Sequence, residues 1–163
     1  MVQDHHGFMW FGTMDGLNRF DGYIVKVYRK ELNDSSGLRN NRITDLKVDN
    51  QGNLWIAHDL GIQVLNFETN QFRFFNHPRK LKIMASQIEL VAKDQILVNS
   101  LDSLYLLDVK SGKFSSLKDL PLFPLKIKKI KNKIYLIGRN KIFLWQNNKV
   151  KSYLVFPDEK LNL

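Results

Sequence analysis

A motif that occurs twice with a fixed spacing constrains the fold of this chain more than any other feature. Residues 4–17 and residues 49–62 both contain, in the same order, an Asp-x-x-Gly turn, a tryptophan and a later glycine. Trp10 and Trp55 are 45 residues apart. A strand-rich repeat of about 40–45 residues is the size of one four-stranded propeller blade. The motif therefore predicts an all-β fold, a partial β-propeller.

The second copy of the motif shows how one blade is built. Short segments of alternating apolar residues, bounded by Gly, Asn and Asp, are typical of strands. Between two of them, Asp49 and Gly52 are suited to the first and last positions of a type I turn. Four strands are expected in this unit, over Arg42–Val48, Asn53–Ala57, Gly61–Asn66 and Gln71–Phe75.

Two later units keep the pattern with weaker sequence agreement. Residues 95–99 and 133–138 replace the tryptophan strand, and Leu97 and Tyr135 stand at the tryptophan position. We expect one propeller segment of about four blades, each a four-stranded antiparallel sheet, with no linker to a second domain. The blades are expected near residues 1–30 (incomplete), 42–75, 88–117 and 125–156.

The first unit lacks most of its first strand, because residues 1–3 are only the tail of such a strand. Each blade of a repeat protein buries its faces against neighbouring blades. We therefore expect the chain to be a fragment of a longer protein. The remaining blades, or a second copy, would then close the ring.

Composition limits the class of protein. With 163 residues and 44% hydrophobic residues, the chain can form one folded domain with a sizeable core. There is no run of 18 apolar residues that would span a membrane, and the first twenty residues do not resemble a signal peptide. The absence of cysteine excludes disulfides and thiolate chemistry, although it does not identify a compartment.

The positive charge lies in the second half of the chain. Residues 1–78 contain 8 Lys+Arg and 9 Asp+Glu, and residues 79–163 contain 17 and 7, so the net charges of −1 and +10 sum to +9. Such asymmetry is found in polyanion-binding faces, but a solvated strand face rich in lysine is the simpler explanation. Nucleic acid could use the same charge, but no nucleic-acid-binding motif is present.

The segment around residues 125–133 is the most basic part of this half. In a strand, Lys126 and Lys128 share one face and Ile127 lies on the other. The adjacent Lys128 and Lys129 break the alternation, so a β-bulge is expected there. Lysines on an outer edge strand would discourage edge-to-edge pairing. Lysines on an inner strand would instead gather near the channel and suit a sulfated or uronic-acid glycan.

No pattern of catalytic or metal-binding residues is present. The four histidines form no spaced cluster with acidic residues, and no nucleophile–base pair or phosphate-binding glycine loop occurs, so neither a cofactor nor a metal is expected. The residues expected to have structural roles in the repeat are Asp4, Trp10, Gly12, Gly16, Asp49, Trp55 and Gly61. The candidate ligand contacts are His58, Lys126, Lys128, Arg139 and Lys141.

The repeat resembles one family in particular. Residues 7–22, GFMWFGTMDGLNRFDG, together with LRNNRI at 38–43 and DNQGNLWI at 49–56, are similar to the two-component regulator propeller repeat. In that family the repeat belongs to the periplasmic sensor region of hybrid two-component histidine kinases, which sense oligosaccharides. Ala57 and His58 depart from the family's usual Gly and Thr.

The resemblance implies a ligand-sensing segment of such a receptor, which binds an oligosaccharide without turnover. If the basic second half contacts the ligand, that oligosaccharide would be acidic. The resemblance also implies a periplasmic location, with kinase chemistry in domains absent from this sequence. Two other functions remain open. One is a protein-interaction scaffold, and the other is a propeller lyase that resembles the streptogramin-inactivating enzymes.

Overall fold

The fold consists of four four-stranded antiparallel sheets, as the repeat predicts. The computed structural model describes residues 1–76, 84–101, 103–117, 126–138 and 140–156. These residues form strands, turns and irregular segments and contain no helix. Among them, accordingly, there is no helix of the length and hydrophobicity needed to cross a membrane.

Each sheet is one blade, and its strands pair in chain order. The first two blades contain β1 (Val2–Gln3), β2 (Met9–Thr13), β3 (Gly16–Phe20) and β4 (Val25–Tyr28), then β5 (Ile43–Val48), β6 (Leu54–His58), β7 (Gly61–Asn66) and β8 (Gln71–Phe75). The third and fourth contain β9 (Gln87–Ala92), β10 (Gln95–Asn99), β11 (Leu104–Asp108) and β12 (Lys113–Ser116), then β13 (Lys126–Ile130), β14 (Lys133–Ile137), β15 (Lys141–Gln146) and β16 (Lys149–Val155).

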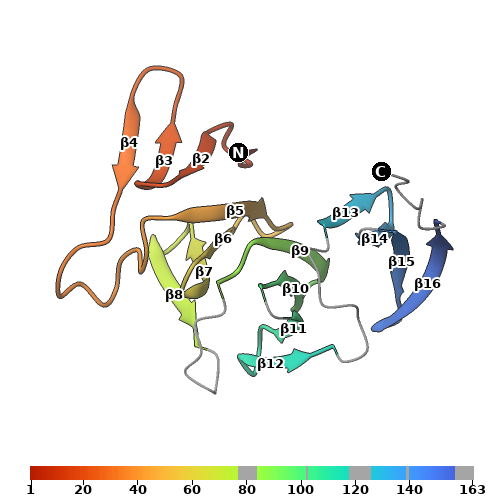
Figure 1. Cartoon of the computed structure of the whole chain (residues 1–163). Coiled ribbons are helices and arrows are strands. Elements are labelled where there is room, and N and C mark those ends of the chain that lie inside the picture. The colour runs from red at the N-terminus through yellow and green to blue at the C-terminus, as the bar shows by residue number, and fades with distance from the viewer. Residues whose placement is uncertain (77–83, 102, 118–125, 139, 157–163) are drawn as a thin grey trace, which may run out of the picture.

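The four blades follow one another round an open arc, as Figure 1 shows. The first strand of each blade lies on the inner side of the arc, where β5 contacts both β1 and β9, and β9 contacts β13. The lysine-rich β13 is therefore an inner strand, which is one of the two alternatives left open by the sequence.

The apolar core lies between the blades and consists of three clusters. Trp10 packs with Leu46 and Ile56 between the first and second blades. Trp55 packs with Ile88 and Ile96 between the second and third blades. The third cluster, between the third and fourth blades, contains Leu97, Leu104, Ile127, Ile134, Leu136, Phe143 and Trp145. The repeated tryptophans are thus packing residues, and Leu97 takes the corresponding place in the third blade.

Side chains on the inner strands also bond to the backbone of the neighbouring blade. The Asp45 carboxylate accepts a hydrogen bond from the Ile88 N–H at 3.0 Å. The Gln87 amide donates to the Ile127 carbonyl at 2.6 Å and accepts from the Ile127 N–H at 2.8 Å. These bonds satisfy backbone groups on the inner edges that have no strand partner, and they hold adjacent blades in register.

One detail of the sequence interpretation needs correction. The β-bulge expected at Lys128 and Lys129 is not there, because these residues pair in unbroken register with Tyr135 and Ile134. The strand keeps its alternation because Lys129 lies on the packed face and extends its amine to the Leu90 carbonyl at 3.1 Å. The first blade begins with the two-residue β1, which agrees with the strand tail expected at residues 1–3, and all four blades have four strands.

Gly12 gives a direct test of how closely the first two blades approach. A Cβ atom at this position would lie 2.9 Å from the Ile43 Cβ on the inner strand of the second blade. We expect Gly12→Ala to lower the free energy of unfolding by about 1–3 kcal/mol, because overpacking displaces the neighbour. Urea denaturation measures this change. Combining it with Ile43→Ala should give less than the sum of the two losses, and strict additivity would contradict the contact.

Candidate functional site

The lysines expected from the sequence lie in the fourth blade but not on one surface. Lys126 and Lys128 on β13 share the blade face of their partners Ile137 and Tyr135, which is opposite to the buried Ile127. Ile142 on β15 pairs with Ile137 and so shares the face of Lys126. Lys141 is the residue next to Ile142 on the same strand, so it lies at the same end of the sheet but on the other face. Arg139 lies outside the described residues. Their role as ligand contacts stays a prediction.

His58, the remaining candidate, has no exposed surface. It lies at the end of β6, in another blade from the lysines. Its Nδ1 accepts a hydrogen bond from the Leu60 N–H at 3.1 Å, and its Nε2 lies 3.1 Å from the Gln63 Oε1. Burial lowers the pKa of His58 to about 4, although the Gln63 hydrogen bond and the Asp59 charge raise it. A neutral, enclosed imidazole cannot touch a ligand at the surface, so we remove it from the candidate contacts.

Gln63 links His58 to the connection between the first and second blades. The Oε1 atom of Gln63 also accepts from the Arg39 N–H at 2.8 Å, and its Nε2 donates to the Gly37 carbonyl at 3.1 Å. Because Gln63 Oε1 is an acceptor and Leu60 N–H is a donor, the imidazole proton belongs on Nε2. The hydrogen-bond network thus gives His58 a structural role that involves no ligand.

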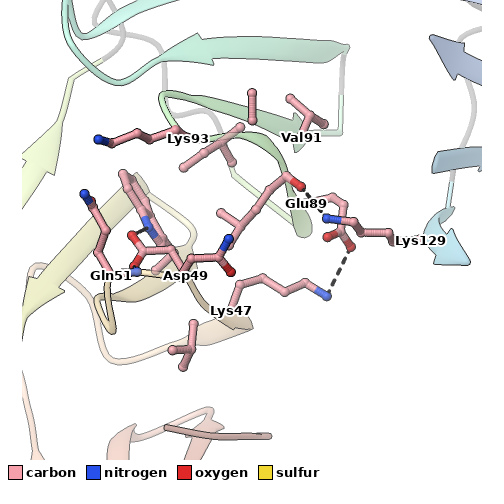
Figure 2. A pocket seen from close by; sticks show the side chains of 13 residues that line it. Lys47, Asp49, Gln51, Glu89, Val91, Lys93 and Lys129 are labelled. Carbon is pink, nitrogen blue, oxygen red and sulfur yellow. Dashed lines mark hydrogen bonds and ion pairs between the residues drawn. The ribbon is translucent and has the colours of Figure 1, made fainter. Parts of the chain in front are cut away.

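A polar pocket lies between the second and third blades, at the end where the first strand of each blade turns into the second. It is a pocket of about 510 Å³. Lys47, Glu89 and Lys129 come from the inner strands β5, β9 and β13, so three consecutive blades contribute to it. Figure 2 shows these side chains at one end of the pocket, with Lys93 and Gln51 at the other.

A tightly bonded turn forms one wall. The Asp49 carboxylate accepts hydrogen bonds from the Gln51 and Asn53 backbone N–H groups and from the Trp55 indole, all at 2.9 Å. Asp4 accepts from the His6 and Phe8 N–H groups and the Trp10 indole in the same way. The Asp of the repeat therefore joins the turn to the core tryptophan, and in the second blade this places the Gln51 amide at the pocket.

A second pocket of about 260 Å³ continues along the same blade boundary. It shares Asp49, Gln51, Trp55 and Lys93 with the first and extends to Arg73 on the outer strand β8. We call the two pockets together the blade 2/3 groove. It runs from the inner strands towards the outer edge of the second blade.

The carboxylates of the groove are already engaged. Asp49 holds the turn described above, Glu89 lies 3.4 Å from the Lys47 amine, and Asp94 lies 3.0 Å from the Lys110 amine. Lys93 and Lys129, by contrast, form no ion pair with a carboxylate among the described residues. The groove therefore has an excess of positive charge available to a ligand.

Sequence interpretation missed this groove because its residues are far apart in the chain. Lys93 lies in the third-blade turn that corresponds to residues 49–52 of the second blade. The repeat alone therefore predicts that these two turns lie at the same end of their blades. What it did not show was that Lys129 faces the third blade. Within the described part of the chain, no group of three or more His, Cys, Asp or Glu residues could hold a metal ion.

Known proteins resemble this chain in sequence and in fold. Residues 37–59 match the two component regulator propeller family. A segment of 36 residues is 50% identical to histidine kinase P4 of Formosa agariphila, and it spans 22% of this chain and 3% of that protein. The repeat resemblance inferred from residues 7–22, 38–43 and 49–56 is thereby confirmed.

Solved structures share the fold. Two are extracellular domains of proteins described as hybrid two-component systems of B. thetaiotaomicron, with TM-scores of 0.61 and 0.72 and identities of 18% and 21%. The chain is covered to 94% and 93%, and it spans 29% and 24% of those domains. Virginiamycin B lyase of Staphylococcus aureus also matches, with a TM-score of 0.72, 16% identity, and coverage of 94% of this chain and 54% of the lyase. At these identities the structures establish the propeller fold alone.

Proposed function

We propose that this chain is part of the extracellular, ligand-sensing propeller region of a two-component signalling receptor, located in the periplasm. The observation that carries this proposal is the two component regulator propeller match at residues 37–59, which include β5 and β6 of the second blade. The 50% identity with a histidine kinase over 36 residues supports the same class of protein. Phosphotransfer would belong to other parts of such a receptor.

The proposed ligand is an oligosaccharide that binds and is released unchanged. A long groove with side-chain amides and ammonium groups suits a linear, polar ligand with many hydroxyl groups. Asp49 accepts hydrogen bonds from its own turn and from the Trp55 indole, and Glu89 and Asp94 form ion pairs with lysines. Because these carboxylates are already engaged, the groove favours binding over acid–base chemistry. Binding would act by shifting the population of receptor conformations.

The outer faces of the first and fourth blades have a further part in the proposal. Exposed apolar side chains occur in both blades, among them Val25 and Val27 on β4 and Tyr153 and Leu154 on β16. Exposed apolar surface of this kind commonly marks a contact with another protein surface. We propose that other blades, of this chain's parent protein or of a second copy, cover these faces.

Titration calorimetry of the 163-residue chain against a panel of neutral, sulfated and uronic-acid oligosaccharides tests the proposed function. We expect saturable binding of at least one member of the panel, and chromatography should recover that oligosaccharide intact after prolonged incubation. Recovery of cleaved or unsaturated products would instead support a lyase. Failure of the whole panel to bind would contradict oligosaccharide sensing by this segment.

A further inference from the structure

We propose that the blade 2/3 groove is the ligand site and that it selects oligosaccharides bearing carboxylate or sulfate groups. This inference rests on the proposed function and deepens it by naming the site and the ligand class. The larger pocket of the groove, at about 510 Å³, has the size of known small-ligand sites, and the smaller pocket extends it along the blade boundary. A chain of several sugar units fits such a shape better than a compact metabolite.

Charge decides the class of ligand. Lys129 reaches the groove from β13, and its ammonium group donates one hydrogen bond, to the Leu90 carbonyl, out of the three it can make. Lys93 is exposed and lies where the two pockets meet. Both remain without a carboxylate partner among the described residues, as shown above. Charge-assisted hydrogen bonds to an anion are about twice as strong as neutral ones, so acidic sugars gain most from these two lysines.

The aromatic wall of the groove argues against recognition by stacking. Trp55 lines both pockets, but only 4% of its surface is exposed. One ring face is stacked on Phe75 with ring centroids 5.5 Å apart, and its indole N–H is bonded to Asp49. Neutral glycans often depend on an exposed aromatic face, which Trp55 does not offer. Specificity therefore comes from the lysines together with the Asn50 and Gln51 side chains of the turn.

The position of Lys129 has a mechanical consequence. Asp49 and Gln51 belong to the second blade, Glu89 and Lys93 to the third, and Lys129 to the fourth. A ligand held by Lys129 and by the second-blade turn at once would connect three consecutive blades. Binding should therefore stabilise the arc itself, and the melting temperature should rise with ligand concentration.

Two variants with equal charge but different geometry test the site. Lys129 and Lys128 are adjacent on β13 and lie on opposite faces of the sheet. We expect the double variant Lys93→Gln with Lys129→Gln to bind a chondroitin sulfate hexasaccharide about tenfold more weakly or worse, as expected for the loss of one charge-assisted hydrogen bond or more. The comparison variant, Lys126→Gln with Lys128→Gln, tests the rival contacts expected from the sequence. It removes the same charge, and if the groove holds the ligand it should change the affinity by less than about twofold, the effect of general screening.

The unsubstituted chain provides an independent readout. Acetylation of lysines followed by mass spectrometry should show Lys93 and Lys129 protected by the chondroitin sulfate hexasaccharide, and Lys128 unprotected. Equal weakening by both double variants, or protection of Lys128 alone, would place the anion on the other face and overturn the assignment. Equal affinity for maltohexaose would overturn the selectivity for acidic sugars while leaving oligosaccharide sensing intact. Binding of neither sugar nor any other member of the panel above would contradict the proposed function itself.

Discussion

Replacing Asp49 with alanine should lower the free energy of unfolding by about 3 kcal/mol, one of the two largest effects expected in this protein. The substitution leaves the Asn53 N–H and the Trp55 indole N–H without their acceptor in a partly buried site. Each buried donor that loses its partner costs about 1–3 kcal/mol, whereas the exposed Gln51 N–H can turn to water. Domains of this size are stable by only about 5–15 kcal/mol, so the loss is a large fraction of the total.

Urea denaturation at neutral pH measures this loss, and two comparisons assign it. Asp108 also accepts two hydrogen bonds in a turn, from the Ser111 N–H and hydroxyl, but both bonds lie at an exposed site where water can replace the acceptor. Asp108→Ala should therefore be much milder than Asp49→Ala. The variant Trp55→Phe has no indole N–H for Asp49 to accept from. Asp49→Asn should therefore lower the free energy of unfolding less in this variant than in the parent chain. An Asp49→Ala variant as stable as the parent would show that the turn and the tryptophan are not coupled.

The blade architecture could be predicted from sequence because its signals are local. Strand alternation, the Asp-x-x-Gly turn and the 45-residue spacing of Trp10 and Trp55 all lie within one or two neighbouring units. The same signals identified the repeat family, since the turn and the tryptophan are joined by hydrogen bonds that require those residue types. In the third and fourth blades Leu97 and Tyr135 replaced the tryptophan, and the alternation alone was enough to place the strands.

The groove could not be predicted because it depends on how blades pack against one another. Lys93 and Lys129 belong to different blades, and no local pattern specifies which face of β13 turns towards the third blade. Adjacent lysines suggested a bulge, when in fact one lysine extends along the packed face and the other along the opposite face. The basic composition of this segment identified Lys126 and Lys128 as candidate ligand contacts. Lys129, which reaches the groove, was instead interpreted as part of a β-bulge.

His58 illustrates a further limit of sequence interpretation. The sequence made it a candidate ligand contact, and it occupies the position of Thr13 in the first blade. In that blade the Thr13 hydroxyl accepts a hydrogen bond from the Asp15 N–H at 3.1 Å, two residues on, just as His58 Nδ1 accepts from Leu60. Thr13 and His58 therefore share one role, because each side chain accepts a hydrogen bond from the backbone of the following turn. Only the fold shows that the histidine is also enclosed against Phe74 and Gln63.

That burial makes the protein sensitive to acid. The pKa of His58 is about 4 in the folded chain, against an ordinary value of 6.5. Above pH 6.5 the imidazole is neutral in both states and does not affect stability. Between pH 6.5 and about 4 the unfolded chain binds a proton that the folded chain does not, so the free energy of unfolding falls as the pH falls. Below about 4 both states are protonated and this contribution levels off.

Urea denaturation between pH 7 and pH 4 should therefore show a loss of about 3 kcal/mol from His58, the equivalent of its lowered pKa. His58→Thr is the matched variant, because a threonine hydroxyl accepts the same turn N–H in the first blade and does not titrate in this range. The variant starts less stable at pH 7, since a cavity replaces the imidazole, but its stability should fall less steeply with acid. The exposed His5 and His6 remain in both chains, so they do not contribute to the difference. Equal slopes in the two chains would mean that His58 is protonated in the folded state, and the Leu60 N–H would then have to bond elsewhere.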